Sequence, residues 1–435
     1  MNRPKTPSQQ VIQTSQPGTT SYVLFVGACI AWVLGSLGRI PLASGAVILP
    51  LDIVVGMIAL TRMVHVKEWY QQIRTDAVGR YFLLFCAFGG MSLVLTMLLQ
   101  RPVALEWGQF FNSFLYLVRF GAYGQLLWLF PRHSTPFKDN IHRPWLSVIL
   151  LAGLSMAILG FAQYFLYWDL RNLYYAGWDE HVARLFGTVL DPNYMGALLT
   201  VIIALLQVWK SLSLRESLNR YSKILYTTAP MSIVLLSVGV VLTYSRSSYL
   251  MLGTYALFVY ATSLKKVRNL LLIGTAGILL MTLTPSIRTT SEGTNLLRTA
   301  SIQSRLTEYS QAIHIFSESP IRGVGYNAYR YAQRAHQFLP EKSWTTDHAG
   351  AGVPNSYLFI LATTGIVGMG IFIKMMYPLM MELRAHHSVH VYALLMALGV
   401  HALTENTLFY PFILFPVAVL VSYVRREVIS YSLVS

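Results

Sequence analysis

Residues 355–379 read NSYLFILATTGIVGMGIFIKMMYPL, and Lys374 is the one charged residue among them. A helix of about 20 apolar residues is long enough to cross about 30 Å of hydrocarbon. Comparable apolar runs recur along the chain at 21–40, 44–63, 81–100, 107–131, 145–167, 194–212, 224–244, 248–264, 269–285, 390–404 and 408–424. The sequence therefore predicts an all-α, polytopic integral membrane protein with about 12 transmembrane helices.

The overall composition supports this class. Of the 435 residues, 54% are hydrophobic and 12% are charged, and the mean hydropathy is +0.49. Soluble proteins carry about 25% charged residues. A bilayer explains the deficit, because a charge at its centre costs at least ~2.5 kcal/mol. Cys29 and Cys86 both lie inside apolar runs, so we expect buried thiols and no disulfide.

The net charge of +15 raises the possibility of nucleic-acid binding, but the placement of the charges argues against it. If the N-terminus is cytoplasmic, most Lys and Arg residues fall in segments on the cytoplasmic side. This distribution is typical of charges that orient membrane helices. We therefore predict no nucleic-acid partner, both termini in the cytoplasm, and a multi-pass protein of the bacterial inner membrane.

The alternation of polar and apolar sequence divides the chain into five parts. We expect a disordered cytoplasmic tail at 1–20, nine membrane spans at 21–285, a periplasmic loop at 286–354, three spans at 355–424 and a cytoplasmic tail at 425–435. A loop of about 70 residues is far longer than a connection requires, which predicts a functional role. Two features weaken the predicted spans: Arg119 interrupts the fourth run, and Glu405-Asn406 separates the last two.

Four short blocks follow one another on this predicted topology. They are Arg184…Gly187…Asp191-Pro192-Asn193, then Ser245-Arg246-Ser247, then Gly323-Val324-Gly325, and finally Pro354-Asn355…Gly365…Gly368. In this order, and with the large loop before the tenth span, the chain resembles the Wzy-type O-antigen ligase and polymerase superfamily. These proteins are membrane glycosyltransferases that act on undecaprenyl-diphosphate-linked glycans. The resemblance covers most of the chain from about residue 180 onward.

The resemblance implies roles for particular residues. Two arginines of the ligases hold the diphosphate of the donor on the outer side, and these correspond to Arg184 and Arg246. A histidine that activates the acceptor hydroxyl precedes the asparagine of the fourth block, but Pro354 occupies that position here. This departure favours a polymerase over a lipid A-core ligase and leaves the general base unassigned.

The residues themselves suit this chemistry. A lipid diphosphate is a good leaving group, so the protein mainly has to neutralise its charge and position the acceptor. Arginine binds phosphate oxygens bidentately and stays charged. The alternative for each arginine is an interfacial side chain that snorkels to the membrane surface. Residues flanking or within the four blocks complete the predicted substrate-binding set, which is Arg184, Arg246, Asn193, Arg305, Arg322 and Asn355.

The general base has several candidates. His348 lies closest to the position of the missing histidine, and Asp347 could orient it or raise its pKa. Glu308 and His336 are rivals, and Glu405 lies near the outer end of a late span. We select His348 and Glu308 as the predicted catalytic residues. A transition state in which the acceptor loses its proton late would instead need only a hydrogen-bond acceptor such as an asparagine.

The long loop offers further binding surface. Tyr326, Tyr329 and Tyr331 are interleaved with arginines, a mixture that suits sugars and polyanions; the alternative for 326–337 is a solvated amphipathic helix. Gly323-Val324-Gly325 lacks the context of a phosphate loop and more simply allows a tight turn. No Cys/His spacing is typical of zinc, and the acidic residues are too scattered to suggest a magnesium site. We expect metal-independent chemistry without a cofactor.

The leading hypothesis is a polymerase of O-antigen or exopolysaccharide that joins undecaprenyl-diphosphate-linked repeat units on the periplasmic face of the inner membrane. Its partners would be the lipid-linked glycan, membrane lipid and a chain-length regulator. The alternative is an O-antigen ligase that transfers the glycan to lipid A-core or to a protein. A flippase or transporter is disfavoured, because transporters often place charged sites at mid-membrane and show repeated halves.

Overall fold

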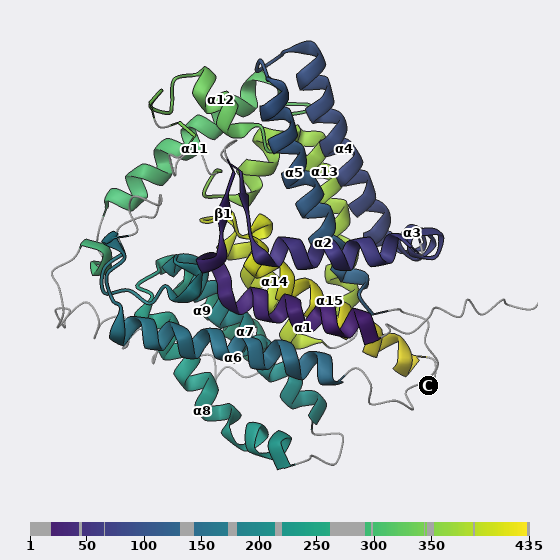
Figure 1. Ribbon diagram of the computed structural model, residues 1–435, viewed down its shortest axis with the longest axis vertical. Helices are drawn as coiled ribbons and strands as arrows, with labels where there is room; N and C mark the ends of the chain where they lie inside the picture. The colour runs from purple at the N-terminus through teal and green to yellow at the C-terminus, as the bar shows by residue number, and fades with distance from the viewer. Residues whose placement is uncertain are drawn as a thin grey trace, which may run out of the picture.

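The computed structural model describes residues 19–42, 46–64, 66–130, 143–172, 181–213, 220–261, 292–296, 299–342, 344–345, 352–385 and 388–432. Helices dominate these residues (Figure 1). They are α1 (Thr19–Leu34), α2 (Pro50–Met63), α3 (Val66–Thr75), α4 (Ala77–Leu99), α5 (Trp107–Gly124), α6 (Arg143–Leu166), α7 (Pro192–Ser213), α8 (Arg220–Leu242), α9 (Arg246–Tyr260), α11 (Ala300–Glu318), α12 (Tyr329–Ala335), α13 (Ser356–Ala385), α14 (Val389–His401) and α15 (Pro411–Ser432).

Short elements join the helices. The 3-10 helices are η1 (Gly35–Gly38), η2 (Gln125–Trp128), η5 (Gly187–Val189), η6 (Glu292–Thr294) and η8 (Thr407–Phe409). Strands β1 (Ile40–Pro41) and β2 (Val47–Ile48) form a small antiparallel hairpin between α1 and α2, in which Ile40 pairs with Ile48. The all-α prediction is thus confirmed for the described residues apart from this hairpin.

Six helices in the described part of the chain are long and apolar enough to cross a membrane. They are Thr20–Gly38, Ala77–Leu99, Pro144–Leu166, Pro192–Leu212, Ser222–Leu242 and Ser356–Ala385. The described helices overlap all the predicted apolar runs except 269–285, which lies outside the described residues. Several of these helices, such as α2, α9 and α14, are shorter than a full span. A polytopic membrane protein is therefore supported, whereas the number of twelve spans stays a prediction.

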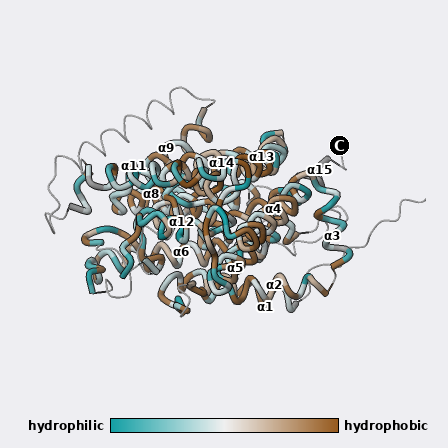
Figure 2. Tube along the Cα trace, turned by 90° about the horizontal axis from the view of Figure 1, so that it is seen from above, coloured by the Kyte–Doolittle hydropathy of each residue, from teal (hydrophilic) through white to brown (hydrophobic). Residues whose placement is uncertain are grey.

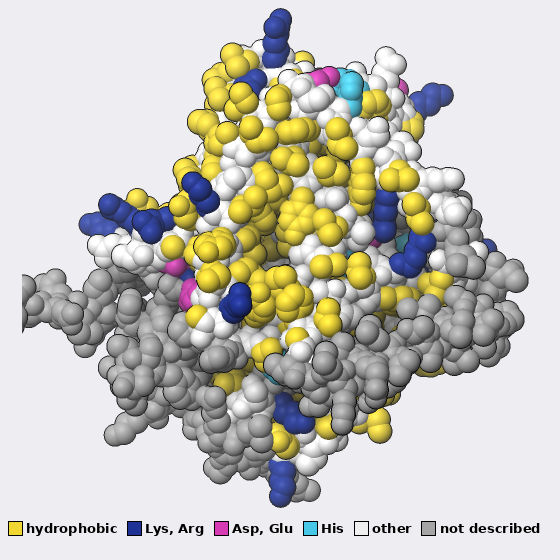
Figure 3. All heavy atoms as spheres, turned by 180° about the vertical axis from the view of Figure 1, so that it is seen from behind, with side chains coloured by type: hydrophobic (Ala, Val, Ile, Leu, Met, Phe, Trp, Pro, Cys, Tyr) yellow, Lys and Arg dark blue, Asp and Glu magenta, His cyan; other side chains and the backbone are white. Residues whose placement is uncertain are grey.

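The outer surface also fits a bilayer. Along the chain trace, α4, α13 and α14 are largely hydrophobic, whereas α3 and α12 are more hydrophilic (Figure 2). Figure 3 shows a broad patch of exposed hydrophobic side chains on one face, with Lys and Arg mainly toward the edges of that patch. A contiguous apolar surface of this kind is rare on soluble monomers. Lipid is the solvent that such a surface requires.

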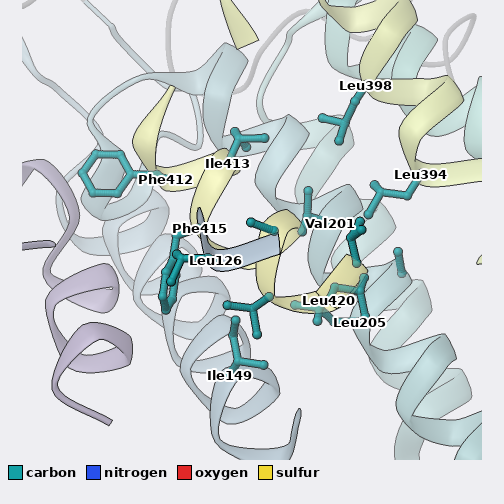
Figure 4. Packing of buried hydrophobic residues seen from close by; sticks show 14 of the residues in the cluster. Leu126, Ile149, Val201, Leu205, Leu394, Leu398, Phe412, Ile413, Phe415 and Leu420 are labelled. Atoms are coloured by element: carbon teal, nitrogen blue, oxygen red, sulfur yellow. The ribbon is translucent and has the colours of Figure 1, made fainter. Parts of the chain in front are cut away.

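Helix α7 lies at the centre of the bundle. Its residues from Met195 to Leu206 are all buried, and it packs against α6, α8, α9, α14 and α15. Figure 4 shows part of this packing, with Val201 and Leu205 of α7 among side chains from α14, α15, α6 and η2. Close packing is what holds helices together in lipid, since lipid tails are as apolar as the side chains themselves.

Arg119, which interrupts the fourth apolar run, has a charged partner inside the bundle. Its Nη2 lies 2.6 Å from Oδ2 of Asp52 on α2, and the hydroxyl of Tyr123 donates to Oδ1 of Asp52 at 2.9 Å. Asp52 also accepts the backbone N–H of Leu49 and so caps α2. The ion pair lets an arginine lie within an apolar helix, because each charge is compensated.

A second ionic cluster joins four elements. Arg425 of α15 is 2% exposed, and its Nη2 lies 2.9 Å from carboxylate oxygens of both Asp76, at the start of α4, and Glu382, on α13. The indole N–H of Trp128 in η2 donates to Asp76 at 2.8 Å. Residues 425–432, which the charge pattern assigns to a cytoplasmic tail, continue α15. Arg425, the first of these residues, therefore links α15 to α4 and α13 inside the bundle.

The described part of the predicted loop 286–354 is folded onto the helices. It contains α11 and α12, which lie together at one end of the molecule (Figure 1). Tyr326 is 3% exposed and Tyr329 is 1% exposed, and both pack in the core. These two rings are buried because the turn before α12 docks on α4 and α13, so neither the sugar-stacking nor the solvated-helix interpretation holds for them.

The glycine blocks explain this docking. Gly323 (φ 71°) and Gly325 (φ 104°) form a tight turn, as the sequence predicts, and the N–H groups of Val324 and Gly325 donate to the carbonyls of Ala362 and Thr363. Gly365 (φ 65°) breaks α13 at this level. A Cβ on Gly365 would lie 2.3 Å from the carbonyl oxygen of Ile321. The third and fourth sequence blocks thus form one packing contact, called here the glycine joint, in which the turn at Gly323–Gly325 packs into the kink of α13 at Gly365.

Candidate active site

Arg184 joins the first two sequence blocks. Its side chain is buried, with 5% exposure. The Nε atom donates to the carbonyl of Thr243 at 2.8 Å, and Nη2 lies 3.3 Å from Oδ1 of Asn193. Nη2 also lies 3.4 Å from the carbonyl oxygen of Tyr244, in the α8–α9 turn. The fold therefore brings the segment before α7 together with the turn before α9, as the arginine hypothesis requires.

The start of α7 is shaped by its cap. Oδ1 of Asp191 accepts the N–H groups of Asn193 at 2.7 Å and Tyr194 at 3.2 Å, the usual arrangement at a helix N-terminus. Ser248 of α9 donates to the carbonyl of Asn193 at 2.9 Å. Gly196 permits this approach, since a Cβ there would lie 2.4 Å from Oγ of Ser248. Two helix N-termini, which favour anions, consequently lie together.

Arg246 is the first residue of α9 and reaches toward the loop helix. Its Nη2 donates to Oγ of Ser301, near the start of α11, at 2.6 Å. Partial burial and the neighbouring positive charge of Arg305 lower the pKa of Arg246. The two predicted arginines, one on α9 and one on α11, thus lie close enough for their charges to repel each other.

Arg305 of α11 forms an ion pair with Glu405, which lies between α14 and η8. The Glu405 residue is buried, with 7% exposure. Burial raises the pKa of Glu405 to about 8, although the positive charges of Arg305 and Arg184 lower it. Asp191 and Glu308 add negative charge nearby and raise it further. A carboxyl with such a pKa exchanges its proton near neutral pH, which is the property of a general base.

The segment around Glu405 is held firmly. Its backbone carbonyl accepts the hydroxyl of Ser356 at 3.2 Å, and the same hydroxyl oxygen accepts the N–H of Leu408. Tyr194 of α7 stacks on Tyr410, with ring centroids 3.8 Å apart. These contacts hold the backbone around Glu405 against α13 and α7, while its carboxyl is held by Arg305 of the loop helix α11.

Asn355, in the fourth block, is the cap of α13. Its Oδ1 accepts the N–H groups of Tyr357 at 2.9 Å and Leu358 at 3.0 Å, and its Nδ2 donates to the carbonyl of Leu403 at 2.9 Å. The hydroxyl of Tyr309 lies 2.8 Å from the same Leu403 carbonyl and 3.1 Å from that of Pro354. Asn355 therefore anchors the segment that leads to Glu405, which is a structural reason for its presence.

The remaining predicted residues are distributed differently. Glu308 lies on α11, accepts a hydrogen bond from Ser304 at 3.2 Å and contributes to the field at Glu405. Arg322 lies in the glycine turn and donates to the carbonyl of Arg101 at 2.7 Å, which ties it to the α4–α5 connection. His348 lies outside the described residues. The structure thus places Arg305, Arg184 and Glu308 close enough to Glu405 to act on its charge, with Arg246 beside Arg305 and Asn193 beside Arg184.

Glu405 is the residue that sequence reasoning undervalued. The sequence offered it as a lesser candidate for the general base, because it lies near the outer end of a late span. The available signal was an acidic residue directly between two apolar runs, where an ionisable group is costly and is a candidate for function. What the sequence could not supply was Arg305, its partner, which lies 100 positions earlier.

Residues 231–373 match the family described as O-antigen ligase. The match supports the resemblance to the O-antigen ligase and polymerase superfamily. Members of this family are membrane glycosyltransferase-like enzymes, and the family implies lipid-linked glycan substrates. The matched segment contains Arg246, Arg305 and Asn355. A search among curated proteins found no match to this chain.

Proposed function

We propose that the protein is a polysaccharide polymerase of the bacterial inner membrane, which joins undecaprenyl-diphosphate-linked repeat units of O-antigen or exopolysaccharide on the periplasmic face. The growing glycan on its lipid diphosphate is the donor, and a sugar hydroxyl of a second lipid-linked repeat is the acceptor. The observation that carries the proposal is the ion pair of Arg305 with the buried Glu405, with Arg184 close enough to act on the same carboxyl and Arg246 close enough to Arg305 for the two charges to repel.

The arginines act on the leaving group. As the bond between the anomeric carbon and the diphosphate oxygen breaks, negative charge grows on that oxygen. Arg184 and Arg246 stabilise this charge, because guanidinium groups bind phosphate oxygens in pairs and hold their charge at any working pH. The N-termini of α7 and α9 add positive potential at the same place. The proposed step uses no metal ion.

Glu405 acts on the acceptor. Its carboxylate takes the proton of the attacking hydroxyl as the new bond to the anomeric carbon forms, and the electron pair of the broken bond leaves with the diphosphate. A pKa of about 8 makes the carboxyl basic enough to accept this proton while leaving part of it ionised at neutral pH. Glu405 therefore takes the role that the ligase histidine, replaced here by Pro354, would have had.

A ligase is the second candidate, because the family match carries the description O-antigen ligase. In that case the arginines and Glu405 keep their roles, and the acceptor is lipid A-core or a protein instead of a second lipid-linked repeat. The two activities differ only in the acceptor, so the product distinguishes them.

The test is product analysis after reconstitution of the full chain in proteoliposomes with a lipid-linked repeat unit. A ladder of longer lipid-linked glycans is expected from the wild type without any second acceptor. Arg184→Ala and Arg246→Ala should each lower the rate by about 100-fold or more, the usual cost of losing a group that stabilises transition-state charge. Arg334→Ala is the matched control, since Arg334 is an exposed arginine of the same loop region that pairs with exposed Glu341.

The alternatives give different results. Products that appear only after lipid A-core is added would replace the polymerase with the ligase. Movement of the lipid-linked unit across the bilayer without any new glycosidic bond would favour a transporter and reject the glycosyltransferase. Equal loss of rate in Arg334→Ala and the two site variants would remove the assigned role of the arginines.

A further inference from the structure

Three potential metal ligands lie together outside the candidate active site. His314 and Glu318 are one turn apart on α11, and His336 caps the C-terminus of α12. Their ligand atoms all lie within 4.8 Å of one another. The Nε2 atom of His336 lies 3.1 Å from the Glu318 carboxylate, and Nε2 of His314 lies 3.8 Å from it. We propose that these three side chains form a zinc site that fastens α11 to α12.

The ligand set suits zinc. Two imidazoles and one carboxylate bind Zn²⁺ with bonds of about 2.0–2.2 Å, and water completes a tetrahedral site. Bonds of this length place the ligand atoms of a tetrahedron about 3.4 Å apart. The two distances to Glu318 already bracket this value. His314 is 55% exposed in its side chain, so rotation of its ring can close the remaining gap. Magnesium and calcium prefer oxygen ligands and fit this set poorly.

The backbone holds His336 in place. Gln337 has a left-handed conformation (φ 58°), its N–H donates to the carbonyl of Arg334 at 2.9 Å, and the N–H of Phe338 donates to that of Gln333 at 2.9 Å. This pair of bonds is the Schellman motif, which ends a helix in a fixed geometry. The His336 ring is therefore presented toward α11 by the helix end itself.

Side-chain contacts also orient the rings. Phe338 stacks on His336, with centroids 5.4 Å apart, and meets the edge of His314 at 5.9 Å. The amide of buried Gln333 donates to Gln311 of α11 at 3.1 Å, beside the cluster. Phe338 thus orients the half-buried His336 ring beside Glu318, whereas the more exposed His314 ring keeps room to turn toward the same carboxylate. The two imidazole rings meet edge to face, with centroids 5.1 Å apart, so both lie near Glu318.

The site has a structural consequence. His314 follows Arg305 by nine residues on α11, a distance of about 14 Å along the helix. A metal ion at this end would fix α11 against α12 and the glycine turn, and so hold the arginine end of the helix steady. The ion would lie apart from the reacting groups and take no part in the chemistry.

Metal binding by the full chain tests the proposal. Tag-free protein in detergent is stripped with chelator and titrated with Zn²⁺ by calorimetry, and with Co²⁺ while the visible absorption is recorded. One equivalent of Zn²⁺ per chain is expected, with the absorption bands of a four-coordinate Co²⁺ site. His336→Ala and Glu318→Gln should each weaken binding by tenfold or more. Glu341→Gln, which removes an exposed carboxylate of the same region, should bind as the wild type does.

The readouts separate a metal site from a simple hydrogen-bonded cluster. Zn²⁺ should slow proteolysis between α11 and α12 in the wild type and not in His336→Ala. Absence of stoichiometric binding would reduce the cluster to a hydrogen bond between His336 and Glu318 and overturn the proposal. Binding that persists unchanged in the double variant His314→Ala/His336→Ala would place the metal elsewhere and overturn it as well. Glu318→Gln preserves the shape of the side chain, so its result does not depend on a large change in folding.

Discussion

Arg305 and Glu405, which lie 100 positions apart in the sequence, form an ion pair that joins the loop helix α11 to the segment between α14 and η8. Removing a carboxylate and a guanidinium from water is costly, and their mutual attraction offsets that cost only in good geometry. Burial nevertheless dominates at Glu405, whose pKa rises to about 8. The pair is therefore poised between the ionic and the neutral state near physiological pH.

The first prediction concerns the pH dependence of transfer. If Glu405 accepts the proton, activity should rise with pH and level off above about 8, because the carboxylate is the active form. Arg305→Ala removes the largest influence that lowers this pKa, so the inflection should move to higher pH. Rates of product formation between pH 6 and 9.5 provide the measurement. A rate that does not change with pH between 6 and 9.5 would exclude Glu405 as the base.

The second prediction separates catalysis from stability at Glu405. A folded pKa above the ordinary value of 4.5 means that the folded state binds the proton more tightly than the unfolded state. The stability contributed is present below about 4.5 and is lost as the pH rises through about 8. Glu405→Gln is neutral at every pH, so its thermal midpoint should equal or exceed that of the wild type at pH 9 while transfer is abolished. Inactivity accompanied by a lower midpoint would indicate a structural role instead.

The third prediction concerns Asn355. Asn355→Ala removes the cap of α13 and should cost about 1 kcal/mol, whereas Asn355→Asp keeps an oxygen that can accept the two N–H groups. Aspartate cannot donate to the Leu403 carbonyl, so the Glu405 segment should loosen in both variants. Thermal midpoints and transfer rates are compared for the two. Full stability in Asn355→Asp with lost activity would show that positioning of the Glu405 segment matters more than the cap.

The fourth prediction concerns the glycine joint. Gly365→Ala places a Cβ 2.3 Å from the carbonyl of Ile321 at a positive φ, so the turn and the helix kink cannot both persist. A loss of about 3 kcal/mol is expected from this combination of overlap and strain. Gly370→Ala, five residues later on the same helix, meets nothing within 4 Å and should stabilise the helix by up to ~1 kcal/mol. Chemical unfolding in detergent compares the two, and equal effects would contradict the packing.

The fifth prediction concerns the buried cluster of Arg425. Asp76→Asn removes a carboxylate charge that compensates the guanidinium of Arg425, a residue that is 2% exposed. The substitution should therefore destabilise the protein by about 3–5 kcal/mol. The exposed pair of Arg334 and Glu341 provides the comparison, since such pairs contribute about 0–1 kcal/mol. Thermal unfolding of the variants of both pairs is followed by tryptophan fluorescence; Trp128 donates to Asp76 and so lies within the buried cluster. A small effect of Asp76→Asn would mean that Glu382 alone compensates Arg425.

The sequence by itself determined the class of the protein. Apolar runs and a low charge content require lipid as solvent, and they placed the helices with good accuracy because hydrophobicity is a local property of the chain. The order of four short blocks indicated the family, and the glycines predicted the turn at Gly323 and Gly325. Arg184 and Arg246 were identifiable through the resemblance to the superfamily, and Arg305 because it flanks one of the four blocks.

Only the tertiary structure decided how these groups combine. The pairing of Arg305 with Glu405, the partner of Arg119 and the meeting of His314 with His336 all join residues that are distant or unpatterned in sequence. Tyr326 and Tyr329 are candidates for sugar binding in the sequence, yet they are core residues in the fold, because the turn before α12 packs on α4 and α13 and buries them. The physical reason is common to all these cases: burial and charge compensation depend on which helices pack together, and hydropathy along the chain does not specify that.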